Sequence, residues 1–445
     1  MCSCHSTKRS REVLCLLLVG LFSVISAGRV EAQKDSFEGP PVDYLKRAVH
    51  DPVAILAKKL SSCDAELQYD QKHGFLKSVL EELDIPESSQ VLVFSKTSLQ
   101  IQRISPRHPR AIYFSDDVYV GWCFHGDVIE LASTDPEQGA IFYSLKQSEF
   151  ATPNMLRDRG QCLTCHASSR TQDVPGYLVR SVSPDKAGHP ILGSGTFTTD
   201  HTSPFANRWG GWYVTGSHGR MEHMGNQIYS EDKESSSQPS GLNRKSLEEY
   251  FDTSAYLTPH SDLVALMVLE HQTQMHNAIT AASFETRQAM AQSYDMNKLL
   301  EREEGFVSES AQRRMEAVAD QLLYHLFMCD EFQLQDPVSG TSDFALDFVK
   351  RAKVDSTGRS LRDLDLQTRL FKYPCSYIIY SPSFDRLPDK VLQIVLTKAL
   401  RILEGEEVST KYSHLKKENR TAILEILLET KPLVREAYQQ LTSAR

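Results

Sequence analysis

The sequence has no excess of the residues that mark fibrous, disordered or nucleic-acid-binding chains. Its 445 residues include 22 glycines and 19 prolines, and no segment repeats at a fixed period. Collagen-like, low-complexity and repeat architectures are therefore excluded. Acidic residues outnumber basic ones by 58 to 49, which gives a net charge of -9. Because this balance favours neither nucleic acid nor anionic lipid, we expect small molecules or proteins as partners.

Common enzyme signatures are missing as well. No glycine-rich phosphate loop or dinucleotide fingerprint follows an expected strand, so nicotinamide and flavin cofactors have no support. The Gly-x-Ser-x-Gly signature of many hydrolases does not occur. No run after residue 32 is apolar enough to span a membrane. These absences leave the export signal and the cysteines as the informative features.

The N-terminus has the layout of an export signal. Lys8, Arg9 and Arg11 precede an apolar run over 13–27, and Val30-Glu31-Ala32 offers small residues for cleavage after Ala32. A membrane anchor is the alternative, but the run is short for a hydrocarbon layer of roughly 30 Å. We therefore expect residues 1–32 to be removed and the mature chain to be periplasmic or otherwise exported, with no membrane attachment.

The motif that carries chemistry is Cys162-Leu-Thr-Cys165-His166. Two thiols at this spacing can each form a thioether with a haem vinyl group, and the adjacent histidine can then be the proximal iron ligand. Covalent attachment keeps a cofactor on an exported protein. We predict one covalent haem c bound through Cys162, Cys165 and His166.

This motif has two other interpretations, a structural zinc site and a redox dithiol. A structural zinc site needs a second pair of ligands, and no other CxxC, HxxxH or CxxxxH pair occurs in the mature chain. A redox dithiol would open a helix in a βαβ unit and would not require the histidine that follows. Both are weaker than the haem interpretation.

At these residues the sequence resembles a c-type cytochrome. Similarity to large bacterial proteins described only as cytochrome c-domain proteins extends over GQCLTCHASSR, VPGYLVRSV, HPILGSGTFTTDHTSPF and RWGGWYVTGSHGRMEHMGN, with further segments on both sides. This resemblance covers most of the mature chain and implies a haem, but no activity. Small monohaem cytochromes place CxxCH near the start of a domain of about a hundred residues, and this chain departs from that layout.

The sixth iron ligand would decide the chemistry. Candidates crowd into the segment Ser217 to Asn226, which contains His218, Met221, His223 and Met224. Met224 and His223 are preferred because Gly225 permits a tight backbone approach, so we predict Met224 as a second metal ligand beside His166. The alternative is a polar hairpin end whose histidines face solvent.

A second constellation lies on an expected helix over 261–282. Met267, His271 and Met275 form one stripe at helical spacing, so an imidazole lies within an apolar face. His271 could be a distal ligand or a proton donor, with Glu270 or Gln272 as its partner. The alternative is an inert, hydrogen-bonded histidine. If no side chain ligates the sixth position, His223 and His271 become the catalytic candidates.

Hydrophobic periodicity predicts an α+β fold. After the signal we expect a helical segment over 33–89, a β-rich haem-binding domain over 90–229, a polar linker over 230–243 and a helical domain over 244–445. Helix-like segments are expected in that last domain at 261–282, 285–301, 309–329, 342–352, 388–403 and 416–429. Of the cysteines left after haem attachment, Cys329 and Cys375 are predicted to form a disulfide.

These patterns together predict an exported monohaem c-type cytochrome. It would transfer electrons to a redox partner protein, or perform oxidoreductase chemistry on a small oxidant or reductant at the haem iron. The chain is about four times longer than outer-sphere electron transfer requires, which suits an enzyme or a carrier with docking surfaces. The alternative is a non-catalytic haem sensor or scaffold that binds a partner protein.

Overall fold

The β-rich runs from residue 90 onward form an antiparallel sheet of seven strands in the order β6-β5-β4-β3-β2-β1-β9. The computed structural model describes residues 37–229, 241–303, 305–407 and 409–443. The strands are β1 (Val91–Val93), β2 (Arg110–Phe114), β3 (Val118–Trp122), β4 (Val128–Asp135), β5 (Gly139–Lys146), β6 (Met155–Arg157) and β9 (Trp212–Tyr213). A separate pair joins β7 (Arg180–Val182) to β8 (Thr196–Thr198).

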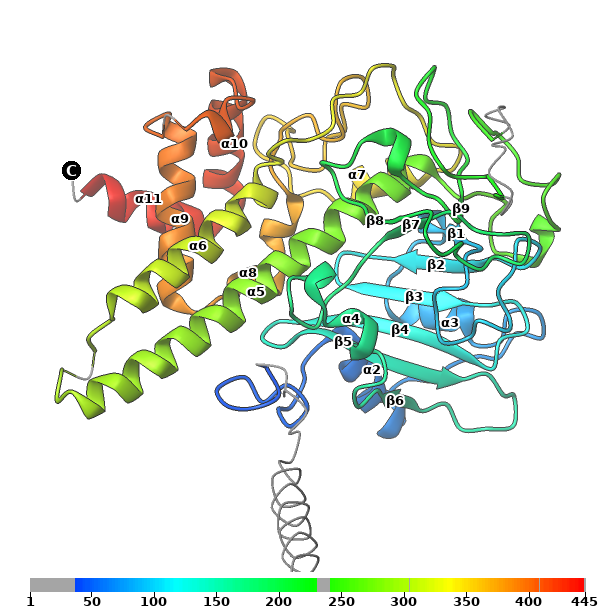
Figure 1. The fold of residues 1–445 in the computed structure, drawn as a ribbon, viewed down its shortest axis with the longest axis horizontal. Helices are drawn as coiled ribbons and strands as arrows, with labels where there is room; N and C mark the ends of the chain where they lie inside the picture. Colours follow the sequence, from blue (N-terminus) through cyan, green and yellow to red (C-terminus); the bar gives the residue numbers. More distant parts are fainter. Residues whose placement is uncertain (1–36, 230–240, 304, 408, 444–445) are drawn as a thin grey trace, which may run out of the picture.

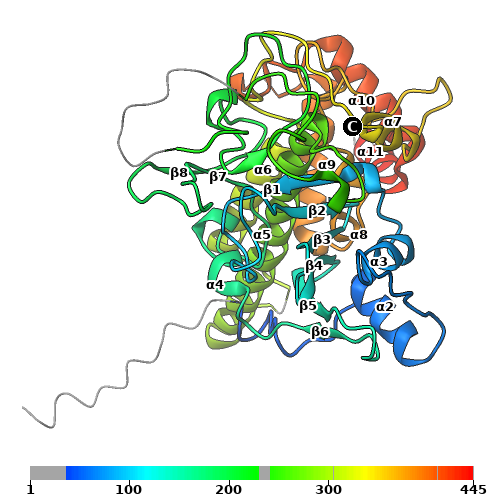
Figure 2. The same ribbon diagram turned by 90° about the vertical axis from the view of Figure 1, so that its right-hand side faces the viewer.

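Helices cover both faces of this sheet and form a group of their own beside it. Figure 2 shows α2 and α3 on one side of the sheet and α4 and α5 on the other. The helices are α2 (Pro52–Ser61), α3 (Leu76–Glu82), α4 (Leu163–His166), α5 (Leu263–Leu299), α6 (Glu309–Leu326), α7 (Phe344–Lys350), α8 (Pro382–Asp385), α9 (Asp389–Glu404), α10 (Lys417–Thr430) and α11 (Pro432–Ser443). Figure 1 shows α5 running from the group of α6, α9, α10 and α11 to the sheet.

The central element is α5. Its N-cap Asp262 accepts hydrogen bonds from the backbone N–H groups of Val264 and Ala265, and every residue from Leu263 to Thr280 is buried. Such all-round burial is typical of a helix in the middle of a core. The predicted division into two helices, over 261–282 and 285–301, is wrong. No glycine or proline interrupts the helix between them, so it continues for 37 residues.

The α+β fold class is confirmed, with the sheet in the N-terminal half and helices in the C-terminal half. Within the expected helical segment over 33–89, α2 begins at Pro52 with Asp51 as its N-cap. The signal segment over 1–32 and most of the linker over 230–243 lie outside the described residues. The domain boundaries stay predictions, and one hydrophobic cluster runs from Phe37 to Val434. None of the described helices combines the length and the apolar character that crossing a membrane would need.

The predicted disulfide between Cys329 and Cys375 is not formed in the described structure, where both are free thiols. Each is fully buried in the hydrophobic cluster. Burial raises the pKa of Cys329 to about 12 and that of Cys375 further still. The two residues therefore act as small apolar core side chains.

We expect Asp51→Ala to destabilise the protein by about 1 to 3 kcal/mol. The Oδ1 atom of Asp51 caps α2 by accepting the N–H groups of Val53 and Ala54 at 3.0 and 3.1 Å. Its Oδ2 atom accepts the hydroxyl of Tyr143 on β5, so the same carboxylate joins the helix to the sheet. Urea unfolding measures the loss, and Asp51→Asn should recover most of it. Equal losses in both variants would show that the cap does not matter.

Candidate functional site

The CxxCH segment borders a cavity of about 440 Å³ between the sheet and α5. This volume lies within the range of cofactor pockets. One face of the sheet supplies a wall, because cross-strand partners Ile112, Gly121 and Glu130 line the cavity together. On α5, Leu269 and Thr273 lie one helical turn apart and form part of the opposite wall.

A short turn brings the three residues of the motif to the cavity. The Oδ2 atom of Asp158 accepts the N–H groups of Gly160 and Cys162 at 2.9 and 3.0 Å, which fixes the entry into α4. Within this single turn, positions three and four apart lie on one side of the helix. Cys162, Cys165 and His166 consequently all line the cavity, as the haem prediction requires.

The tautomer of His166 can be assigned from its one hydrogen bond. Its Nδ1 lies 3.0 Å from the carbonyl oxygen of Gly176, and a carbonyl oxygen can only accept. Nδ1 therefore carries the proton, and Nε2 keeps its lone pair. Burial lowers the pKa of His166, so the ring is neutral at neutral pH. A neutral imidazole with its Nδ1–H bonded to a backbone carbonyl is the usual state of a metal-ligating histidine.

Helix α5 fixes the segment that orients His166. Asn277 accepts the N–H of Tyr177 at 2.8 Å and donates to its carbonyl oxygen at 2.7 Å. The preceding residue, Gly176, also donates its N–H to the carbonyl of His166 at 2.8 Å. A Cβ atom at Gly176 would lie 2.3 Å from the Oδ1 atom of Asn277, so only glycine fits there. The chain from Asn277 through Gly176 holds the imidazole in place.

The cavity is mostly basic in charge. Lys96, Arg110 and Arg180 line it together with one acid, Glu130. Arg110 pairs with Glu130 at 2.7 Å across the bare backbone of Gly121, where a Cβ atom would lie 2.2 Å from the guanidinium. The Nε atoms of Arg110 and Arg180 are buried and have no hydrogen-bond partner among the described residues. These donors suit a ligand that brings carboxylates.

The cysteines do not have the properties of a redox dithiol or a zinc site. Burial and the nearby Asp158 raise the pKa of Cys162 to about 12, whereas redox-active CxxC pairs lower a thiol pKa. Within the described ranges, the one group of three or more histidine, cysteine or acidic side chains close enough to hold a metal ion is Asp200, His201 and His325. Cys162, Cys165 and His166 do not form such a group, so a thiolate zinc site has no support.

The residues predicted as distal ligands lie elsewhere. His218 and His223 pack edge to face, at 4.8 Å between ring centroids, in an aromatic cluster with Phe205 and Trp209. Nδ1 of His223 accepts the N–H of Gly225 at 3.0 Å. The Sδ atom of Met224 accepts the hydroxyl of Ser181 at 3.6 Å. None of the four candidates from the 218–224 segment lines the cavity. Ligation by Met224 therefore stays a prediction without a contact to support it.

His271 lies on another side of α5 from the cavity wall. Its Nε2 lies 2.7 Å from the hydroxyl of Ser376, and its ring packs against His201 and Phe371. The partners proposed for it are engaged elsewhere: Glu270 pairs with Arg208 at 3.0 Å, and Gln272 donates to Tyr119 at 2.8 Å. A catalytic role for His271 at the predicted haem stays untested, and in this structure His271 does not line the cavity.

Sequence reasoning did not find Arg110, Glu130, Gly176 or Asn277. The alternation of apolar and polar residues along β2 and β4 predicts that Arg110 and Glu130 lie on one face of a sheet. It cannot show that the two side chains form an ion pair. Trp212 also lines the cavity. Comparison of the chain with family models, with curated proteins and with solved structures found no match.

We expect Asn277→Ala to cost about 2 to 4 kcal/mol, since it strands the buried N–H and carbonyl of Tyr177 without partners. Thr286→Val, on the same helix, is the matched control. Thr286 is buried, and its hydroxyl has no partner in the described structure, so its removal should change stability little. Denaturant unfolding of both variants measures the difference. Similar midpoints for the two would contradict the role given to Asn277.

Proposed function

We propose that the protein is an exported monohaem c-type cytochrome whose haem lies in the cavity between the sheet and α5. The observation that carries the proposal is the placement of Cys162, Cys165 and His166 along that cavity, with Nδ1 of His166 bonded to Gly176. Cys162 and Cys165 would form the thioethers, and Nε2 of His166 would be the proximal ligand. The haem supplies redox chemistry at its iron.

The cavity residues fit the rest of this cofactor. Haem carries two propionate carboxylates, and Arg110 and Arg180 each present a buried Nε–H that has no partner in the described residues. Phe142, at 4.8 Å between ring centroids from His166, and Trp212 supply apolar cover. An apolar macrocycle with two anionic groups matches a cavity that is apolar at its walls and basic in charge.

The lining supports oxidoreductase chemistry at the iron rather than electron transfer alone. Of the described cavity residues, His166 is the one imidazole, and none is a methionine. The sixth position would then be open to a small oxidant or reductant.

Tyr119 lies in the cavity wall and accepts a hydrogen bond from Gln272 at 2.8 Å. Because Gln272 is the donor in this bond, Tyr119 keeps its hydroxyl hydrogen, and we propose that it donates this hydrogen to a molecule bound in the cavity.

Burial keeps this tyrosine protonated. It raises the pKa of Tyr119 well above the ordinary value, so its hydroxyl is a neutral donor at any physiological pH. Tyr119 would therefore orient a bound molecule and stabilise negative charge developing on it.

A sensor or scaffold protein would also bind the haem but would not need to turn over a substrate. Turnover of an added oxidant therefore distinguishes the two functions.

The covalent link is tested by extraction. Protein made in an exporting, haem-attaching host should keep its haem through acid-acetone treatment, because thioethers survive denaturation. Cys162→Ala combined with Cys165→Ala should lose it. Cys63→Ala, which removes an exposed cysteine away from the cavity, should retain it. Extraction of the pigment from the wild type, or equal haem content in the double variant, would end the proposal.

The open coordination site is tested by the spectrum of the reduced protein with and without CO. We expect a high-spin iron that binds CO in the wild type and in Met224→Ala and His223→Ala alike. Tyr119→Phe should still bind CO but shift the CO stretching frequency, since a hydrogen-bond donor is removed. A low-spin wild type that becomes high-spin only in Met224→Ala would instead support ligation by Met224.

A further inference from the structure

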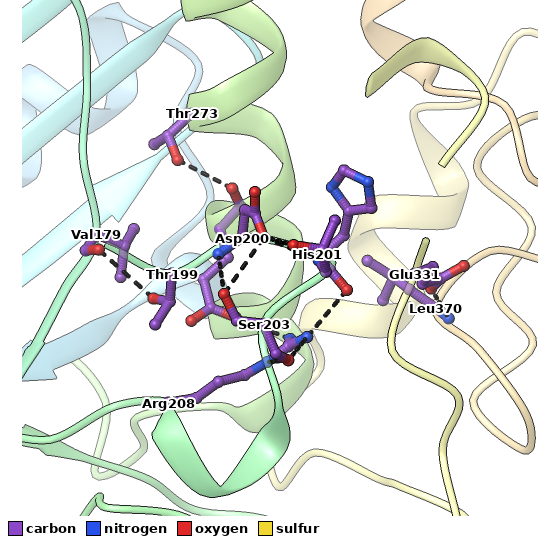
Figure 3. Close-up of polar contacts among 11 residues, drawn as sticks. Val179, Thr199, Asp200, His201, Ser203, Arg208, Thr273, Glu331 and Leu370 are labelled. Carbon is purple, nitrogen blue, oxygen red and sulfur yellow. Dashed lines mark hydrogen bonds and ion pairs between the residues drawn. The ribbon is translucent and has the colours of Figure 1, made fainter. Parts of the chain in front are cut away.

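A second cluster of ligating side chains lies outside the cavity. Asp200 and His201 follow β8, and His325 lies in the last turn of α6. One oxygen or nitrogen atom from each of the three lies within 4.8 Å of the others. Figure 3 shows Asp200 and His201 on the segment that continues from Thr199, whose hydroxyl donates to the carbonyl of Val179. The cluster therefore joins the haem-binding half of the chain to the helical half.

The orientation of His201 is set by a backbone carbonyl. Its Nε2 lies 3.1 Å from the carbonyl oxygen of Cys329, so Nε2 carries the proton. The other ring nitrogen, Nδ1, then holds a lone pair, and it is buried without a partner in the described structure. This is the arrangement that fixes a histidine for metal binding.

His325 brings a second unsatisfied imidazole to the same place. It is 6% exposed, its Nδ1 is buried without a hydrogen-bond partner in the described residues, and its ring lies 5.6 Å from that of His201. A buried nitrogen left without a partner costs about 1 to 3 kcal/mol, a cost that a bound ligand would remove.

Asp200 contributes the negative charge. Its Oδ1 atom accepts the N–H and the hydroxyl of Thr202 at 2.8 and 2.7 Å and the hydroxyl of Ser203 at 3.3 Å. No hydrogen bond from the described residues reaches Oδ2. These hydrogen bonds favour the carboxylate form of Asp200. The carboxylate is thus ionised, with one oxygen free for another ligand.

From this geometry we propose that Asp200, His201 and His325 bind a divalent transition-metal ion, separately from the haem site. Two neutral imidazoles and one carboxylate are the donor set of catalytic zinc sites and of non-haem Fe(II) sites, both of which keep positions open for water or substrate. The proposal depends on neither Cys162, Cys165 nor His166. It adds a second metal site to the proposed haem protein and stands if the haem is absent.

Charged side chains of both signs lie around the cluster of Asp200, His201 and His325. Glu270 is fully buried, pairs with Arg208 through Oε2 and leaves Oε1 without a partner among the described residues. Burial raises the pKa of Glu270 to about 7. Lys411 lies over the ring of Tyr324, next to His325 in the chain, at 5.2 Å. Arg208 and Lys411 therefore bring positive charge near the cluster, where Asp200 and Glu270 bring negative charge.

Zinc is the probe for the test. Full-length protein without a histidine tag is stripped with a chelator, reloaded with Zn²⁺ and washed, and its zinc content per chain is measured by mass spectrometry. X-ray absorption at the zinc edge then reads the ligands without interference from haem iron. We expect one Zn²⁺ per chain with nitrogen and oxygen neighbours at about 2.0 to 2.2 Å and no sulfur neighbour.

Variants locate the ion. Asp200→Asn, His201→Gln and His325→Gln should each weaken Zn²⁺ affinity about 100-fold or more, since loss of even an outer-shell partner costs about 10 to 100-fold. His414→Gln is the matched control, because His414 bonds the carbonyl of Phe327 at 2.7 Å near the same end of α6. Its affinity should match the wild type. Asp200→Asn preserves size and shape, which keeps the test informative if a histidine variant fails to fold.

Three results would overturn the proposal. The first is a wild type that retains no zinc, and the second is unchanged affinity in Asp200→Asn. The third is sulfur at the zinc edge at about 2.3 Å, which would place the ion on Cys162 and Cys165 and also contradict the haem proposal. Failure of haem attachment alone leaves zinc binding at Asp200, His201 and His325 as expected, so the two proposals fail separately.

Discussion

The structure depends on a helix that carries polar side chains through the middle of the core. From Leu263 to Thr280 every residue of α5 is buried, yet the segment includes Glu270, His271, Gln272 and Asn277. A buried polar group without a partner is costly, so each must find one on a surrounding element. Gln272 reaches β3, Asn277 reaches the loop after α4, and His271 reaches the segment before α8. These bonds fix how the sheet, the CxxCH loop and the C-terminal helices are arranged.

The same helix separates two chemical environments. Leu269 and Thr273 point to the large cavity, whereas Glu270 and His271 lie beside Arg208 and His201. Successive residues of a helix differ in direction by about 100°, so adjacent positions serve different sites. A rigid, buried wall of this kind holds the groups on both sides at constant separation. Functional groups placed on such an element are held more precisely than groups on a surface loop.

Local patterns were predictable from the sequence, and long-range pairings were not. The CxxCH motif spans five residues, the helix cap at Asp51 directly precedes a proline, and the strands alternate apolar and polar residues. Each of these signals can be recognised in a short stretch of sequence. The bond between Asn277 and Tyr177 joins residues 100 positions apart. The 37-residue length of α5 was missed because its pattern loses amphipathic character where all sides are buried. The proposed metal ligands Asp200 and His201 are more than a hundred positions from His325 in the sequence, so their spacing does not form a recognisable motif.

The position of the CxxCH loop in the chain has a consequence for folding. Its cavity is closed by β3 on one side and α5 on the other, and the bond between Tyr119 and Gln272 joins residues 153 positions apart. Contacts of such high sequence separation form late, because loop closure must come first. The sheet and the loop precede α5 in the chain, so the cavity stays open on the side of α5 until the helix docks. Docking of α5 therefore completes the cavity, while Cys165 stays exposed in the folded protein.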